Sequence, residues 1–149
     1  MSLHERLNEG MKEAMKARDS LRLNAIRLMR TAIKNREIEE RHPLDDQGII
    51  AVLSTLVKQR RESAQVYREN DRPELAEKEE QELVVIQEFL PAQLSRGEIE
   101  GIIEAAVSET CAASMKDMGK VMKVVTARTA GRADGREVSE LVKARISRS

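Results

Sequence analysis

The chain has 149 residues, the usual length of one domain or of two small ones. Its residues are 40% apolar and 35% charged, and Tyr67 and Phe89 are its only aromatic residues. This composition and the helical spacing of the aliphatic residues argue against a β-sandwich or barrel. The formal net charge is zero, so no overall basic charge indicates a nucleic-acid ligand.

The charges are unevenly distributed along the chain. Residues 1–42 carry ten basic and seven acidic groups, residues 43–90 carry six and eleven, and residues 91–149 carry ten and eight. Local electrostatic fields can therefore exist where the whole-molecule charge is zero.

Several features bear on the cellular compartment. The single cysteine, Cys111, excludes an intrachain disulfide and fits a reducing environment. The first ten residues, MSLHERLNEG, lack the apolar core of a secretory signal, and no apolar run reaches the length of a membrane span. We therefore expect a cytoplasmic protein without membrane partners.

Two helices are predicted at the start of the chain. Ser2 is followed three residues later by Glu5, the pattern of a capping box, and apolar residues then recur at helical spacing to Ala14. A second helix begins at Asp19 or Ser20. Its apolar residues form two adjacent stripes, which predict a helix packed by neighbours on more than one side.

The next two helices follow a break at Pro43. Asp45 or Asp46 can cap a long third helix to about Asn70, and Pro73 suits the first turn of a fourth. Arg60 falls on the apolar stripe of the third helix. It predicts an ion pair with a buried carboxylate; the alternative is an arginine whose charged end reaches solvent at the bundle edge.

A connector near Pro91 separates these helices from three more. Ser95 with Glu98 forms a capping box, Ser114 can cap the next helix, and Asp134 the last. The sequence thus predicts an all-α protein, with an N-terminal bundle of about four helices (residues 1–92) and a small three-helix C-terminal domain (residues 93–149).

Basic residues gather in the predicted C-terminal domain. Phosphate groups bind to clustered cations of this kind, although an ordinary solvated face would look the same. The candidate contact residues are Lys116, Lys120, Lys123, Arg128, Arg132, Arg136 and Lys143.

Three glycines punctuate the same region. Gly119 lies inside a helical pattern, where glycine often permits the close approach of another backbone. Gly131 is placed to end a helix in the left-handed conformation, and Gly135 follows the cap Asp134. Structural need alone would explain all three.

The residue patterns of catalytic sites are missing from the sequence. His4 and His42 have no second ligand at metal-site spacing, and Cys111 has no nearby histidine. The glycines form no phosphate-binding loop. We therefore expect no catalytic residue, no metal and no cofactor.

Taken together, several strings resemble the YqeY family. They include RLNAIRLMRTAIKN, LVKQRRES, FLPAQLS, SMKDMGKVM and GRADG, and their order extends over nearly the whole chain. The positions that match the family's C-terminal motifs, apart from Lys120 and Arg132 named above, are Met118, Gly119, Val121, Met122, Gly131, Ala133, Asp134 and Gly135. The chain departs from the family pattern at Lys123, near Cys111 and within TARTA (residues 126–130).

The resemblance implies an all-helical bacterial-type protein, similar to the C-terminal region of the B subunit of tRNA-dependent amidotransferases. It implies a non-catalytic module that aids tRNA binding through the basic face. The alternative is a protein-interaction module beside an aminoacyl-tRNA synthetase or amidotransferase subunit. Carbon–nitrogen ligase activity of the chain itself is the third and least expected function, because the sequence offers no nucleophile or ATP site.

Overall fold

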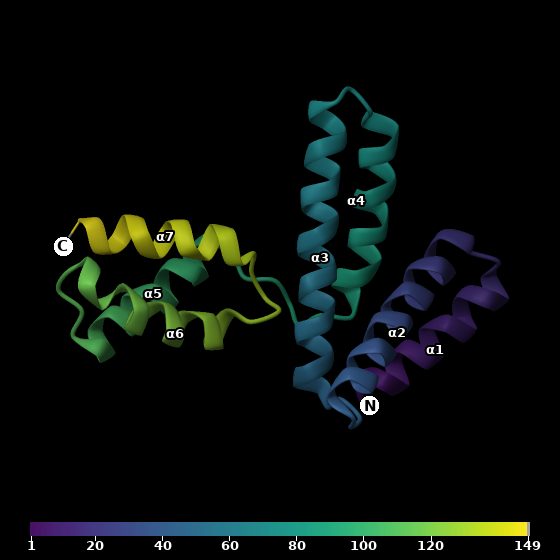
Figure 1. Cartoon of the computed structure of the whole chain (residues 1–149), viewed down its shortest axis with the longest axis horizontal. Coiled ribbons are helices and arrows are strands. Elements are labelled where there is room, and N and C mark those ends of the chain that lie inside the picture. Colours follow the sequence, from purple (N-terminus) through teal and green to yellow (C-terminus); the bar gives the residue numbers. More distant parts are fainter. Residues whose placement is uncertain (149) are drawn as a thin grey trace. The chain divides into compact units, whose positions relative to one another are not determined.

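The computed structural model describes residues 1–148, and these residues form α-helices and one 3₁₀ turn but no strand. The elements are α1 (Leu3–Ala17), α2 (Ser20–Glu40), α3 (Asp46–Glu69), α4 (Pro73–Glu88), α5 (Arg96–Thr110), η1 (Met115–Asp117), α6 (Met118–Thr129) and α7 (Gly135–Ser147). The all-α prediction is confirmed (Figure 1).

Contacts divide the chain into two compact units, one ending at Pro91 and the other beginning at Ala92. Helices α1–α4 form unit 1 and helices α5–α7 form unit 2, each with its own apolar core. That these units are domains with the limits 1–92 and 93–149 stays a prediction.

The helices begin where local side-chain chemistry favours a start. The side chains of Ser2, Asp19 and Asp45 accept hydrogen bonds from backbone N–H groups three residues later, and Pro73 opens α4. Ser95 and Glu98 form the predicted capping box of α5. These starts agree with the sequence because a cap involves only neighbouring residues.

One predicted start is wrong. Ser114 caps the short 3₁₀ turn η1, and α6 begins only at Met118. The Asp117 carboxylate accepts from the amides of Ala113 and Ser114, at 2.9 and 3.4 Å, and gives α6 no side-chain cap. The capping pair of Ser114 and Asp117 therefore stabilises the 3₁₀ turn η1, and α6 begins after that turn.

The core of unit 1 joins α1 and α2 to the C-terminal end of α4. Phe89, which is 4% exposed, packs against α1 where Gly10 has no side chain. A Cβ atom on Gly10 would lie only 3.0 Å from Phe89 Cζ and 3.4 Å from Ile26 Cδ1. Gly10 is therefore required for the close approach of the ring.

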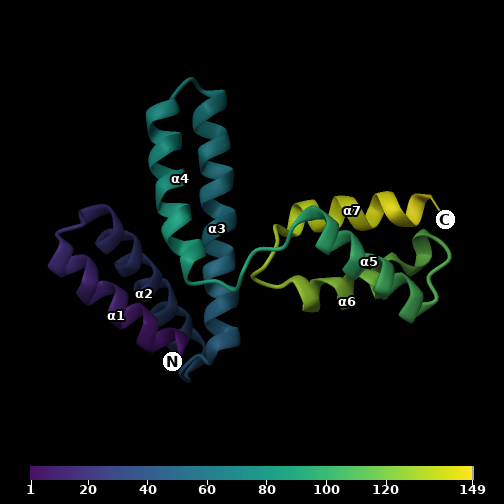
Figure 2. The same cartoon turned by 180° about the vertical axis from the view of Figure 1, so that it is seen from behind.

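The hairpin of α3 and α4 extends past the α1–α2 pair (Figures 1 and 2). The core cluster of unit 1 includes α3 residues only as far as Val57, and its fully buried α4 residues begin at Val85. We call residues 58–82 the arm. Within the arm, Ala64 and Ala76 are buried but belong to neither core cluster.

Ion pairs join the two helices of the arm. Arg60 Nε lies 3.2 Å from Glu82 Oε2, and both side chains are largely buried, at 13% and 15% exposed. Arg68 and Glu80 form a second pair at 2.8 Å, in which both side chains are about half exposed. The prediction of an ion pair at Arg60 is confirmed.

The core of unit 2 consists of aliphatic side chains from α5, α6 and α7. Ile99 and Ile103 on α5 meet Val121 and Val125 on α6, and Val138, Val142 and Ile146 on α7 complete the cluster. Gly119 lies outside it. Among the described residues, no atom outside its own stretch of helix lies within 4 Å of the position that its Cβ would take, so no other helix of unit 2 approaches closely at Gly119. The close approach of a partner at Gly119 stays a prediction.

We predict opposite effects of alanine at two helical glycines. Gly10→Ala should lower the free energy of unfolding by about 1 kcal/mol, because the new methyl group overpacks the site against Phe89. Gly119→Ala should raise it by about 1 kcal/mol, because alanine favours the helix and the space around it is open. Urea denaturation followed by circular dichroism measures both, and effects of the same sign would contradict this account.

We also predict that the ion pair of Arg60 and Glu82 stabilises the arm more than that of Arg68 and Glu80. Arg60→Met alone should lower the free energy of unfolding by about 2 kcal/mol, because it leaves the largely buried carboxylate of Glu82 unpaired. Arg68→Met should cost at most about 1 kcal/mol, since its pair is half exposed. The double variant with Glu82→Gln should recover part of the first loss, and additive effects in that cycle would contradict the coupling.

Candidate functional site

The predicted basic residues come from three elements of unit 2 and the loop before α7. Lys116 lies in η1, Lys120 and Lys123 on α6, and Arg136 and Lys143 on α7, and all five are exposed. Being exposed at three elements, they fit a solvated surface as well as a binding surface. Whether they contact a ligand stays a prediction.

The other two predicted basic residues have structural partners. Arg128 Nη2 donates to Glu109 Oε2 on α5 at 2.6 Å. Arg132 Nε donates to the carbonyl of Ala92 at 3.3 Å, and its own carbonyl accepts from the Leu94 amide at 2.8 Å. Arg132 thus ties the segment before α5 to the loop before α7.

The family-motif residues build the frame of unit 2. Val121 is buried, and Met118, Met122 and Ala133 pack against the core at half-buried positions. Gly131 has a φ of 73°, a conformation that glycine adopts without strain. Asp134 caps α7 by accepting from the Arg136 amide at 3.1 Å, and Gly135 is the first residue of that helix.

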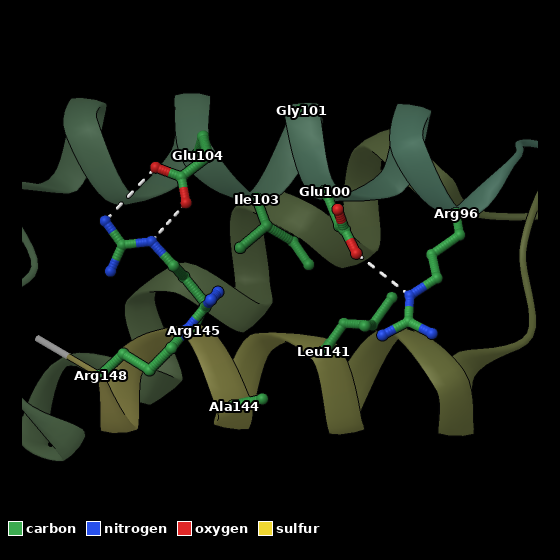
Figure 3. Close-up of a pocket in the computed structure, with 9 residues that line it drawn as sticks. All are labelled: Arg96, Glu100, Gly101, Ile103, Glu104, Leu141, Ala144, Arg145 and Arg148. Atoms are coloured by element: carbon green, nitrogen blue, oxygen red, sulfur yellow. Dashed lines mark hydrogen bonds and ion pairs between the residues drawn. The ribbon is translucent and has the colours of Figure 1, made fainter.

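A groove of about 430 Å³ runs between α5 and α7 (Figure 3). Its lining is made of arginine, glutamate and small or aliphatic residues from the two helices. These are Arg96, Glu100, Gly101, Ile103, Glu104, Leu141, Ala144, Arg145 and Arg148. None of the seven predicted basic residues lines it.

Small residues leave the middle of this groove open. No atom lies within 4 Å of the position that a Cβ on Gly101 would take, and Ala144 on α7 is also exposed. Ile103 is buried below them and Leu141 is half-buried. The floor of the groove can therefore contact an apolar side chain.

Arginine–glutamate pairs flank the open floor. Arg96 Nε lies 3.1 Å from Glu100 Oε1, and both belong to α5. At the other end Arg145 on α7 binds Glu104 on α5, with its Nη2 atom 3.3 Å from Oε2 (Figure 3). Arg148 beside them forms no ion pair among the described residues, so the lining carries one uncompensated positive charge.

The Arg145–Glu104 contact changes the acid–base properties of both groups. The hydrogen bond from Arg145 lowers the pKa of Glu104, which burial partly opposes, and the charges of Arg145 and Arg148 lower it further. The same hydrogen bond raises the pKa of Arg145. Both side chains therefore stay charged around neutral pH.

The arrangement can bind an acidic and apolar ligand. Arg148 can pair with a carboxylate, and the floor around Gly101 can take an aliphatic or aromatic side chain. The residues that line the groove include no serine, threonine, cysteine or histidine. Within residues 1–148 no group of three potential metal ligands is found.

The sequence contained only a weak signal for this groove. Glu100 and Glu104 are four residues apart on α5, and Arg145 and Arg148 are three residues apart on α7, so each pair shares a helix face. Nothing in the sequence indicated that the two faces meet, because Glu104 and Arg145 are 41 residues apart.

Comparison with known proteins identifies the family. The model of the YqeY family, described as Yqey-like protein, matches residues 4–146. The chain belongs to this family. The resemblance seen in the sequence is thereby confirmed, while the model's description names no activity.

Similar curated proteins from several yeasts share one name, Altered inheritance of mitochondria protein 41, mitochondrial. The relative in Vanderwaltozyma polyspora is 41% identical over 85 residues, which cover 56% of this chain and 46% of the relative. The relative in Eremothecium gossypii is 39% identical over 87 residues, covering 58% and 48%. This chain thus spans about half the length of the curated relatives it matches.

These names correct the expected function. The relatives are described by mitochondrial inheritance, which contradicts a bacterial-type module acting with tRNA, an aminoacylation complex or an amidotransferase. The basic residues were a poor guide to function because clustered lysines and arginines occur on solvated surfaces as well as on nucleic-acid interfaces. The predicted tRNA and protein partners have no support from the comparisons.

The expected cytoplasmic location is also contradicted, since the relatives are named as mitochondrial. The lack of a secretory signal and of a disulfide framework does not distinguish the cytoplasm from the inside of an organelle. None of the described helices is long and apolar enough to cross a membrane.

We predict that the Arg145–Glu104 contact stabilises unit 2 above the acidic range. The folded-state pKa of Glu104 is lowered, so the stabilisation is complete above the ordinary value of 4.5 and is lost as the pH falls through the lower folded value. Glu104→Gln should therefore be less stable than the wild type at neutral pH, and the difference should shrink in acid. Urea denaturation at a series of pH values measures this, with Glu140→Gln on the exposed face of α7 as the control.

Proposed function

We propose that this chain is a protein-binding module whose α5/α7 groove holds a short acidic and apolar segment of a partner protein. We further propose that this binding serves the process for which its mitochondrial relatives are named. The single observation that supports the proposal is the open floor at Gly101, bounded at both ends by arginine–glutamate pairs.

The form of the groove favours a peptide segment. Two neighbouring helices make its walls, and recognition of a helix or strand by such a groove relies on a few side chains that enter between them. Ile103 and Leu141 supply the apolar contact, whose burial contributes about 25 cal/mol per Å². The uncompensated Arg148 favours a carboxylate next to the apolar side chain.

A pair of glycine variants on α5 tests the groove directly. Gly101→Leu should fill the floor without disturbing the fold, because the space at Gly101 is open. Gly97→Leu is the matched control. Gly97 also has no atom within 4 Å of its Cβ position and lies one turn earlier, but it does not line the groove.

The first measurement is selection from a library of displayed random peptides. We expect the wild type and Gly97→Leu to select peptides with Asp or Glu next to Leu, Ile or Phe. Gly101→Leu and Arg148→Glu should bind them about tenfold or more weakly. Equal binding by all four proteins would contradict the proposed site.

The second measurement tests whether the chain can serve in mitochondrial inheritance. A Saccharomyces cerevisiae strain that lacks its own relative would express the chain behind a mitochondrial leader, and mitochondrial inheritance would be scored. The wild type and Gly97→Leu should restore inheritance and Gly101→Leu should not. Restoration by all three would show that the groove is not required, and restoration by none would contradict the shared process.

A further inference from the structure

A second groove, of about 490 Å³, lies between α1 and α2 in unit 1. It is lined by His4, Leu7, Asn8, Arg27, Arg30, Thr31, Ile33, Lys34 and Glu37. Three of these side chains are those of arginine or lysine, and one is a carboxylate. The groove therefore favours a negatively charged ligand.

The only carboxylate in the lining already has partners. Glu37 Oε2 accepts from the Leu44 amide at 2.8 Å and lies 3.4 Å from His4 Nε2. Arg30 Nη1 lies 2.9 Å from Met11 Sδ, whereas Arg27 and Lys34 have no ion-pair partner among residues 1–148. The positive charge of the groove is thus not neutralised from within unit 1.

The cations form a line and not a cluster. Arg27, Arg30 and Lys34 follow one face of α2 at intervals of three and four residues, so they extend over about 10.5 Å of helix. A single phosphate cannot reach both ends of this line. A helix with carboxylates at the same spacing can.

Helix α4 has an exposed face with two carboxylates at the first of these intervals, which we call its acidic face. On α4, Glu74, Glu77, Gln81 and Val84 lie at intervals of three, four and three residues, and all are exposed. Glu74 and Glu77 form no ion pair among the described residues. Helix α4 contains six glutamates and one lysine, a net charge of −5, whereas residues 20–36 of α2 contain five basic residues and no acidic one.

The acidic face of α4 is exposed within unit 1. The hairpin of α3 and α4 extends past the α1–α2 pair of its own unit (Figures 1 and 2), and Glu74, Glu77 and Gln81 are exposed. The formal net charge of the whole chain is zero, so long-range repulsion does not oppose the association of two copies.

We propose that the α1/α2 groove is the docking site for the acidic face of α4 in a second copy of this chain. Each copy carries both surfaces, so two copies related by a twofold axis exchange two equivalent contacts and form a closed dimer. Arg30 faces Glu77, and the two outer positions of the line face Glu74 and Gln81. This inference is independent of the function proposed for the α5/α7 groove.

Sedimentation velocity of the full chain tests the proposal with two charge-reversed variants. One is Arg27→Glu/Arg30→Glu/Lys34→Glu, and the other is Glu74→Lys/Glu77→Lys. The wild type should form a dimer at micromolar concentrations that weakens with added salt. Each variant alone should be monomeric, because both contacts then join like charges.

A mixture of the two variants gives the decisive result. In a mixed dimer one contact keeps the original charges and the other has both charges reversed, so both are attractive. The mixture should therefore dimerise although neither variant does. Arg36→Glu, a reversal on α2 outside the groove, should dimerise like the wild type, and circular dichroism confirms that each variant is folded.

Four results would overturn the inference. The first three are a wild type that stays monomeric at all concentrations and salt levels, a dimer that persists in both reversed variants, and a mixture that stays monomeric. Loss of the dimer in Arg36→Glu as well would show that the total charge of α2 matters and not the groove, and would also overturn it.

Discussion

The packing of Phe89 against Gly10 is the contact on which the arrangement of unit 1 depends. The ring is nearly fully buried, and the guanidinium carbons of Arg6 and Arg22 lie 5.5 and 6.0 Å from its centroid. Arg6 also donates to the Glu88 carbonyl at 2.9 Å, and Arg22 binds the Glu88 carboxylate. These contacts fix the C-terminal end of α4 on α1 and α2.

Helix α4 packs on α1 and α2 only at its C-terminal end. Its N-terminal half therefore packs against α3. The buried apolar residues of the arm are two alanines, and the ion pairs of Arg60 and Arg68 join the two helices. A hairpin of this kind buries little apolar surface and leaves its outer faces to solvent. The packing that buries Phe89 in the core therefore also leaves the acidic face of α4 exposed.

The comparisons changed how the charges of this chain are understood. Membership in the YqeY family agrees with the resemblance seen in the sequence, but the relatives are named for mitochondrial inheritance. The basic residues of unit 2 lie on three elements, and two of the seven have structural partners. The two grooves combine charge with a concave surface, and each is lined by residues from two helices.

The sequence by itself determined the helices and most of their starts, because capping and apolar periodicity involve residues within a few positions of each other. It also indicated the ion pair of Arg60, since an arginine on an apolar stripe needs a partner or a path to solvent. Only the tertiary structure decided that another side chain approaches closely at Gly10 and that none does so at Gly119. The grooves were likewise decided by the tertiary structure, because pairs such as Glu104 and Arg145 are far apart in the chain and meet only through helix packing.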